Sequence, residues 1–422
     1  MKTSSRLAAC AFAGMAVGAP AWAQPAALPP VTSVTTPSAA GDTISLREAL
    51  DAAWQRAVSA READGQRRRA EAERLATSRL WAAAPTLELS HRVDRPLGGA
   101  GGRETELGIA VPLWLPGQRA ARSGTADAAA AQAQGAAQVA RLRLAGELRE
   151  AAWHMAALQA EVQQADAQAA ALRQLADDVE RRVRAGDLAR ADSLAAQAEH
   201  LAAAAALADT RQRLQAARAR WTLVTGLTAL PDLSGVAAPD DAAADVARHP
   251  EWQLAAQSTE LARKRLDLVR HSRRDAPELT VGVRQDAPGR GEASQGSLVV
   301  GLRLPFGTDD RNQPLEAAAL SELDIAQTQE QRLRERLDSD IAAARDAQRS
   351  AVLQLDAETA RARLLRERAT LIDKSFRAGE TPLPDLLRVL AAAAQADSAV
   401  ARQTAALGLA RARLQQALGL LP

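Results

Sequence analysis

Five histidines are the first residues in this sequence to suggest chemistry, because imidazole binds transition metals and transfers protons near neutral pH. A metal site usually needs two histidines four residues apart on a helix, or a cluster of histidine, cysteine and carboxylate side chains. The histidines here form no such pair and are scattered at His91, His154, His200, His249 and His271. We therefore expect ordinary surface or seam histidines and no metal centre.

Other motifs that could support catalysis or ligand binding are weak. Residues 98–102 are glycine-rich, but they do not lead from a strand into a helix as a phosphate-binding loop does, so they predict a surface loop. Met155 lies within a helical pattern, where packing explains a methionine better than copper binding does. The sequence has no Gly-x-Ser-x-Gly motif and no grouping of acid, base and nucleophile. We therefore expect no enzyme activity and no bound cofactor.

Two related turns carry the charged residues of greatest interest. Arg184-Ala185-Gly186 recurs 193 residues later as Arg377-Ala378-Gly379, and acidic residues follow both turns. Glycine commonly ends one helix, and Asp or Glu is favoured at the start of the next, so helix punctuation by itself explains this pattern. Recognition of a partner remains open beside that explanation. The candidate residues are Arg184, Gly186, Asp187, Asp192, Arg377, Gly379, Glu380 and Asp385.

Both turns belong to a repeat that covers most of the chain. At the same offset of 193 residues, Val111-Pro112 matches Leu304-Pro305, and Gly226-Leu227 matches Gly419-Leu420. Each copy has a helical pattern, two alternating segments and a long pair of helical patterns. The predicted domains are a signal peptide at 1–23, a Pro/Ser/Thr-rich segment at 24–44, a first repeat at 45–227, a linker at 228–244 and a second repeat at 245–422.

The helical patterns are unusually long. Residues 45–80 predict a first helix, opened by a capping box of Ser45 and Glu48. After Pro116-Gly117 a pattern runs to about Arg184 with apolar or alanine residues at alternating steps of four and three, which is the period of a coiled coil. Its roughly 65 residues would span on the order of 100 Å, too long for a compact domain. A second helix returns to Gly226.

Each copy also has two segments in which apolar and polar residues alternate, as in strands with one apolar face. In the first segment the apolar face has Leu87, Leu89 and Val93, and the polar face has Glu88, Ser90 and Arg92. Strands of about eight to ten residues match the length that crosses a bilayer obliquely. One chain supplies four, whereas even a barrel filled by its own side chains needs about eight. An open pore would therefore need at least three copies and about 12 strands.

The composition and the N-terminus predict an exported, elongated protein. Aromatic residues form 2% of the chain and the net charge is +2, so we expect thin aliphatic helix seams and no nucleic-acid partner. Lys2, Arg6, an apolar stretch and Ala21-Trp22-Ala23 predict cleavage before Gln24. Cys10 lies inside that signal without an apolar stretch before it, so we expect no lipid anchor and no thiol in the mature chain. No later apolar run of about 18 residues occurs, so we expect strands to make any membrane crossing.

Several of these features together resemble the TolC-like outer-membrane efflux proteins. They are the two-copy order, the Val111-Pro112-Leu113 end of the first hairpin, the Arg-Ala-Gly turns and the closing Gly-Leu pairs, and the resemblance covers about residues 45–420. Leu304-Pro305-Phe306 and the following Asp310-Arg311-Asn312-Gln313 are similar to the CzcC-like branch. The first helix departs from the family pattern, because Ala57-Val58 stands where Asn-Pro is frequent, while His249-Pro250 keeps the proline in the second copy.

The resemblance implies a mainly α-helical fold with a small β part. Long coiled-coil hairpins and two transmembrane β-hairpins would form a twofold repeat, and a homotrimer would close a barrel of about 12 strands continued by an α-helical tube. The implied function is passive conduction through the outer membrane, with an inner-membrane pump and a periplasmic adaptor as partners and heavy-metal cations as the cargo of the CzcC-like branch. The two turns would form the periplasmic tip, dock the adaptor and constrict the pore. A soluble periplasmic coiled-coil adaptor or scaffold is the alternative, which the direct repeat of paired strands disfavours.

Overall fold

The computed structural model describes residues 43–94, 101–233, 245–289, 293–306 and 309–422, which belong to one compact unit covering Asp42–Pro422. The predicted signal peptide with Cys10, nearly all of the segment at 24–44, most of the linker at 228–244 and the glycines Gly98 and Gly99 lie outside the described residues. In the part of the chain that is described, no helix is long and apolar enough to cross a membrane.

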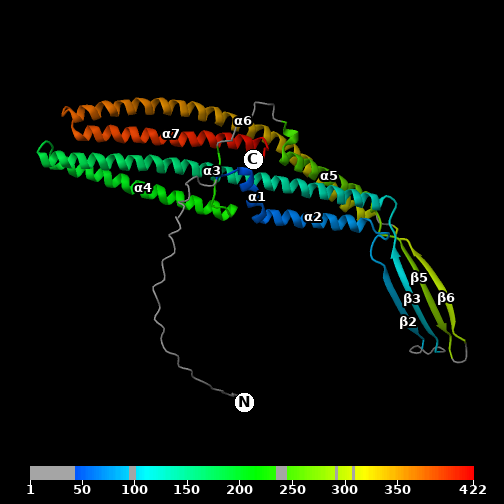
Figure 1. Ribbon diagram of the computed structural model, residues 1–422. Coiled ribbons are helices and arrows are strands. Elements are labelled where there is room, and N and C mark those ends of the chain that lie inside the picture. Colours follow the sequence, from blue (N-terminus) through cyan, green and yellow to red (C-terminus); the bar gives the residue numbers. More distant parts are fainter. Residues whose placement is uncertain (1–42, 95–100, 234–244, 290–292, 307–308) are drawn as a thin grey trace, which may run out of the picture. The chain divides into compact units, whose positions relative to one another are not determined.

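The described chain is mainly helical with a small β part, as predicted (Figure 1). The helices are α1 (Leu46–Arg56), α2 (Val58–Thr77), α3 (Gln118–Ala185), α4 (Arg190–Thr225), α5 (Pro250–His271), α6 (Asp309–Arg377) and α7 (Leu383–Ala417). One sheet contains β2 (Thr86–Val93), β3 (Arg103–Pro112), β5 (Glu278–Ala287) and β6 (Gln295–Arg303). A short parallel pair joins β1 (Thr43–Ile44) to β4 (Leu230–Pro231), and the sequence analysis did not predict it.

The prediction of one helix over residues 45–80 is wrong, because the backbone is extended at Ala57, with φ −67° and ψ 139°, and separates α1 from α2. The predicted capping box is confirmed: the Ser45 hydroxyl accepts from the Glu48 amide at 3.2 Å, and the Ser45 amide donates to the Glu48 carboxylate at 2.9 Å. Both helices pack against α3, and α1 also packs against α4. The additional contact of α1 with α4 gives a physical reason for the break.

Two long helical hairpins form most of the rest of the helical part, with α3 and α6 containing 68 and 69 residues and α4 and α7 containing 36 and 35. The predicted turn after α3 is confirmed: Gly186 has φ +88°, a left-handed conformation that glycine adopts without steric cost. The buried seam of α3 follows the predicted coiled-coil positions, including Leu148, Met155, Leu158, Leu172 and Val179. Figure 1 shows α4 lying along α3 and α7 lying along α6.

The helices and the strands follow the same lateral order. Helix α3 packs against α2 and α4 and also against α5 and α7, and the latter two pack against α6. The sheet has the antiparallel order β2-β3-β5-β6, with Leu89 opposite Leu107, Leu107 opposite Val283 and Val283 opposite Leu298. The margins of the sheet are therefore β2 and β6, and the margins of the helical part are α2 with α4 on one side and α6 on the other.

Arg149 of α3 ties the C-terminal end of α7 to the first half of the chain. Its side chain is 2% exposed, and its two terminal nitrogens donate to the Gln416 side-chain oxygen at 2.7 Å and to the Leu420 carbonyl at 2.9 Å. The Gln416 amide in turn donates to the Leu142 carbonyl at 2.9 Å. Burial lowers the pKa of Arg149 to about 10, so its guanidinium keeps its charge at neutral pH.

His249 joins the same region to α5. The side chain is buried, and its Nδ1 accepts a hydrogen bond from the Glu251 amide at 3.1 Å, which caps the helix. Gly419 lies against the ring, and a Cβ there would be 2.7 Å from the His249 Cδ2 atom. Burial lowers the pKa of His249, although the Glu251 carboxylate and the backbone of Gln416 oppose the shift. The cap therefore needs the neutral imidazole.

Replacing Arg149 should destabilise the protein strongly. The change Arg149→Ala leaves the oxygens of Gln416 and Leu420 without their charged donor, so we expect the free energy of unfolding to fall by about 2–4 kcal/mol. Denaturant unfolding in detergent, followed by circular dichroism, measures this. The control Arg361→Ala removes an exposed pair with Glu358 and should cost at most about 0.5 kcal/mol. Equal losses in the two variants would contradict the role given to Arg149.

Acid should weaken the cap that His249 provides. Because the pKa of His249 is lower in the folded protein than in the unfolded chain, its contribution to stability is complete above the unfolded pKa of about 6.5 and decreases as the pH falls below that value. His249→Asn keeps a capping oxygen without a titrating ring, so the difference in melting temperature between pH 7.5 and pH 5 should become smaller. The exposed His154→Asn serves as the control, and the prediction fails if both variants retain the wild-type difference.

Candidate functional site

The five histidines do not form a metal site within the described part of the chain. The five histidines lie on β2, on α3, on α4 and at the two ends of α5. Three of them make hydrogen bonds: His91 with the Thr105 hydroxyl at 2.9 Å, His249 with the Glu251 amide at 3.1 Å and His271 with the Asp267 carbonyl at 2.8 Å. Within the described ranges, no group of three or more His, Cys, Asp and Glu side chains is arranged to hold a metal ion.

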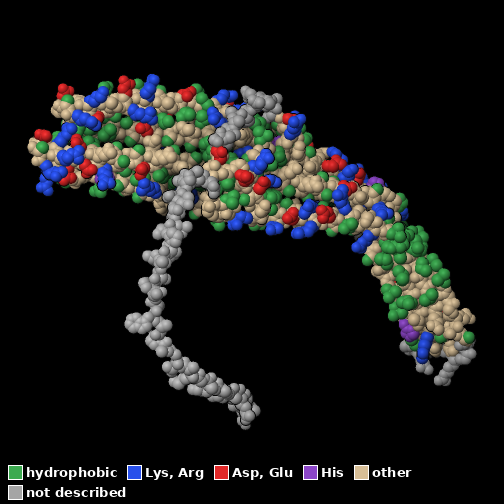
Figure 2. Space-filling view, in the orientation of Figure 1, with side chains coloured by type: hydrophobic (Ala, Val, Ile, Leu, Met, Phe, Trp, Pro, Cys, Tyr) green, Lys and Arg blue, Asp and Glu red, His purple; other side chains and the backbone are tan. Residues whose placement is uncertain are grey.

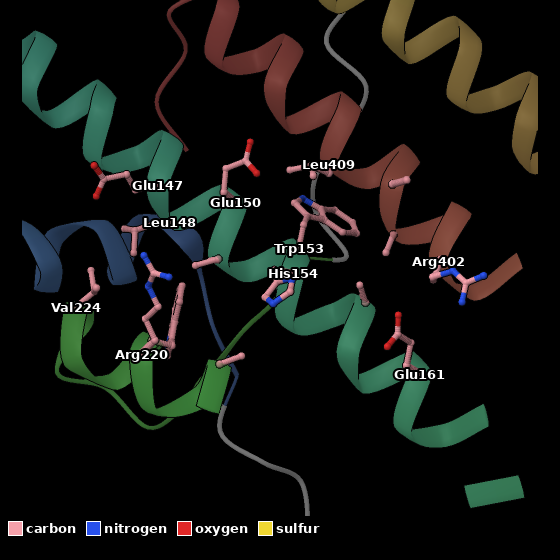
Figure 3. Close-up of a pocket in the computed structure, with 16 residues that line it drawn as sticks. Glu147, Leu148, Glu150, Trp153, His154, Glu161, Arg220, Val224, Arg402 and Leu409 are labelled. Atoms are coloured by element: carbon pink, nitrogen blue, oxygen red, sulfur yellow. The ribbon is translucent and has the colours of Figure 1, made fainter. Parts of the chain in front are cut away.

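A groove of about 820 Å³ lies between α3, α4 and α7 (Figure 3). Glu147, Glu150, Trp153 and His154 enter it from α3, Arg220 and Val224 enter from α4, and Arg402 and Leu409 enter from α7. Two lining carboxylates pair with arginines that do not line the groove: Glu150 with Arg413 at 2.6 Å and Glu161 with Arg213 at 3.4 Å. The Trp153 ring packs against Gly408, where a Cβ would be 2.1 Å from it. The sequence analysis missed this groove because three helices must meet to form it.

The first predicted turn is a tight connection between α3 and α4. The Asp187 amide donates to the Arg182 carbonyl at 2.9 Å, and the Asp192 carboxylate accepts from the Ala189 amide at 3.2 Å, which caps α4. Ending α3 and capping α4 is thus a sufficient role for Gly186 and Asp192. The side chains of Arg184 and Asp187 are exposed, and neither makes a side-chain hydrogen bond or ion pair with another described residue.

The second predicted turn is built in a similar way. Gly379 has φ +80°, and the Glu380 amide donates to the Ser375 carbonyl at 3.0 Å. Arg377 pairs with Asp373 at 2.9 Å and Asp385 pairs with Arg388 at 2.9 Å, each within one helix. The Glu380 carboxylate accepts from the Ser375 hydroxyl at 3.5 Å. These ion pairs are exposed and contribute little to stability.

The structure brings the two turns to the same end of the helical part. A buried cluster joins both hairpins there through Val179 of α3, Ala196 of α4, Phe376 of α6 and Leu386 of α7. The Arg182 guanidinium lies 5.1 Å from the centre of the Phe376 ring. Sequence reasoning missed this cluster, although Phe376 is one of three phenylalanines in the chain and immediately precedes the predicted Arg377.

One face of the sheet is apolar and exposed. Leu87 and Leu89 are each 71% exposed and Leu298 is 72% exposed, whereas leucines in the core of a soluble protein are buried. Figure 2 shows hydrophobic side chains gathered over the sheet and mixed charges over the helices. The exposed apolar set of the strands also includes Val93, Leu107, Ile109, Val281, Val283, Val300 and Leu302. A continuous face of this kind marks a surface that contacts lipid or another protein.

The exposed large apolar side chains of the helices are confined to the margins of the helical layer. On α2 and α4 they are Val58, Leu75, Leu194, Leu201 and Leu223; on α6 they are Leu315, Leu320, Ile325, Val352, Leu353, Leu364 and Leu371. Within the described residues, α1, α3, α5 and α7 have none. The apolar side chains left uncovered therefore lie on α2, α4 and α6, next to the margins that the sheet leaves unpaired.

The chain is similar in sequence to a known resistance protein. No family model matches the chain. The cobalt-zinc-cadmium resistance protein CzcC of Cupriavidus metallidurans is 28% identical over 231 residues, which cover 51% of this chain and 53% of that protein. The chain thus matches only about half the length of this relative.

Solved structures match the fold over nearly the whole chain. The transmembrane channel protein CusC gives a TM-score of 0.75 at 14% identity, covering 90% of this chain and 93% of that one. The outer membrane protein VceC of Vibrio cholerae gives 0.70 at 15% identity, with 89% and 96% covered. The CmeC outer membrane channel of Campylobacter jejuni gives 0.70 at 12% identity, with 89% and 85% covered. The chain thus has the fold of outer-membrane channels, and its resemblance to the TolC-like efflux proteins is confirmed.

Proposed function

We propose that this protein is the outer-membrane channel of a tripartite efflux system. Three copies would close a barrel of about 12 strands, continued by an α-helical tube in the periplasm. Substrate delivered by an inner-membrane pump through a periplasmic adaptor would pass through it without further energy input. The channel proteins among the structural neighbours support a conduit over an enzyme.

The observation that carries this proposal is that two sides of the chain lack a partner: the outer edges of the sheet and the apolar surfaces of the helices beside them. Strands β2 and β6 each leave one backbone edge without a partner in the sheet, and unpaired edges are not tolerated in a bilayer. The neighbouring helical margins, α2 with α4 and α6, carry the exposed apolar side chains. Because the two margins differ, contact between copies would be head-to-tail, and such contacts form a ring when the rotation between neighbouring copies closes. A closed ring covers the strand edges and the exposed leucines together.

The domain assignment follows from the same proposal. Residues 1–23 would direct export and be removed, and residues 45–227 and 245–422 would be two repeats that each contribute one hairpin to the barrel and one helical hairpin to the tube. The apolar face of the sheet would contact lipid, and its opposite face, with Glu88, Glu106 and Arg284, would line the pore.

We assign adaptor docking and the periplasmic aperture to the two turns. They lie together at the end of the helical part, and Arg184 and Asp187 project charged groups that no described contact uses. The other candidates there are Gly186, Asp192, Arg377, Gly379, Glu380 and Asp385. Heavy-metal cations are the cargo that the match to a cobalt-zinc-cadmium resistance protein supports. A soluble periplasmic scaffold is the competing proposal, and an exposed apolar sheet face argues against it.

Charges placed on the helical margins should prevent assembly. Leu201→Glu on α4 and Leu364→Glu on α6 put a carboxylate where an apolar side chain would be buried between copies. We expect each change to weaken association of the trimer at least about tenfold, because it removes apolar burial and adds a buried charge. Sedimentation of the detergent-solubilised protein measures the distribution of trimer and monomer.

The matched control for this experiment is Ala171→Glu, which adds the same charge at an exposed position of α3, away from the margins. It should leave the trimer intact. Wild-type protein that remains a water-soluble monomer, with no partition into outer-membrane fractions, would support the scaffold instead.

Reversing the free charges of the first turn should weaken adaptor binding. Arg184→Glu combined with Asp187→Lys inverts both charges without removing a described contact, so the hairpin should fold normally. We expect binding of the adaptor encoded with this chain to fall at least about tenfold in biolayer interferometry, as expected when charge complementarity is lost. Arg173→Glu with Asp177→Lys, on the exposed side of α3, is the control. Unchanged binding by a trimeric turn variant would refute the docking assignment.

A further inference from the structure

Arginines gather where the sheet meets the helices. Arg79, Arg122 and Arg274 are exposed, and none of the three forms an ion pair with another described residue. We call these three the junction arginines. The segments that contain them hold little negative charge: residues 78–86 and 113–126 contain no Asp or Glu, and residues 270–277 contain only Asp275.

Hydrogen bonds hold these separate segments together at the junction. The Trp114 indole donates to the Arg79 carbonyl at 3.3 Å, and the Arg122 guanidinium lies 5.8 Å from the centre of the same ring. The Gln118 side chain donates to the Ser272 hydroxyl at 3.1 Å, two residues before Arg274. The Leu113 amide donates to the Pro277 carbonyl at 2.7 Å. The junction arginines therefore belong to one connected surface.

The charges at the opposite end of the sheet are arranged differently. There Arg92 pairs with Asp94 at 3.3 Å, and Arg284 pairs with Glu104 at 2.6 Å and with Asp286 at 3.2 Å. The three arginines at that end, Arg92, Arg103 and Arg284, lie among four carboxylates, those of Asp94, Glu104, Glu106 and Asp286, so the described residues there carry no excess of positive charge. The uncompensated positive charge lies at the helical end of the apolar face.

Exposed aromatic and apolar side chains lie beside the junction arginines. Phe306 is 90% exposed, Leu80 is 68% exposed and Trp81 is 38% exposed. Going from the strands toward the helices, the chain thus presents an apolar face, then exposed rings, then unpaired guanidinium groups. Rings of this kind concentrate at the interface between hydrocarbon and water, and arginines there reach the polar headgroups.

We infer that the junction arginines bind the phosphate groups of anionic phospholipids in the leaflet next to the helices. Guanidinium groups bind phosphate through paired hydrogen bonds, and fixed positive charge at this depth favours anionic over zwitterionic lipid. The inference rests on the proposed insertion of the sheet into a membrane. It adds that the channel selects the lipid around its helical end.

The test compares phosphatidylglycerol with phosphatidylcholine. Fluorescent short-chain forms of both lipids are titrated into the detergent-solubilised full chain, and binding is followed by anisotropy. We expect the wild type to bind phosphatidylglycerol about tenfold or more tightly than phosphatidylcholine. The triple variant Arg79→Gln, Arg122→Gln, Arg274→Gln should reduce this preference to about twofold or less.

The matched control makes the same change in charge far along the helices, at the exposed Arg173, Arg363 and Arg402, each replaced by Gln. It should keep the wild-type preference. An unchanged preference in the junction variant overturns the inference, and so does competition by inorganic phosphate as strong as that by the lipid.

A second measurement separates this inference from the proposed function. Wild type and junction variant are reconstituted into vesicles of phosphatidylcholine alone and of phosphatidylcholine with phosphatidylglycerol. Insertion of both proteins without any lipid preference overturns the lipid inference only. Failure of the wild type to insert into either vesicle overturns the proposed channel, and the lipid inference with it.

Discussion

The unpaired backbone of β2 and β6 is the constraint on which the rest of this molecule depends. A free strand edge presents a row of N–H and C=O groups that must find partners, in water or in another chain, and hydrocarbon offers none. In this protein the edges coincide with helical margins that expose leucines at Leu201 and Leu364. The sheet and the helices therefore leave the same two sides of the chain incomplete. In the proposed ring, one kind of contact, repeated between copies, would cover both.

Contacts inside the chain are, by contrast, completed by specific side chains. Phe376 joins the two hairpins at their turns, and Arg149 holds the end of α7 against α3. Small side chains along the seams allow the long helices to approach closely, as at Gly408, where the Trp153 ring occupies the space of a missing Cβ. These internal contacts hold the two hairpins in a fixed arrangement, so that the margins and the turns keep their positions relative to each other.

The sequence predicted the features that depend on local periodicity. The alternation around Leu89 and Leu107 gave the strands and their apolar face, and Pro116-Gly117 and Gly186 gave the ends of α3. It did not predict the break at Ala57, because that break accompanies the contact of α1 with α4 and is not marked by a Gly or Pro. The β1–β4 pair and the groove at Trp153 were missed for the same reason: residues far apart in the chain create them.

The difference between the two margins affects how the proposed ring would respond to damage. A copy altered only on its α6 and β6 side would keep a normal α4 and β2 side and could still join an intact neighbour. It would enter the assembly and leave a gap in the wall. In a cell that holds both forms, one defective copy in three would disable the whole conduit, so such alleles should be dominant, whereas alleles that unfold the chain should be recessive.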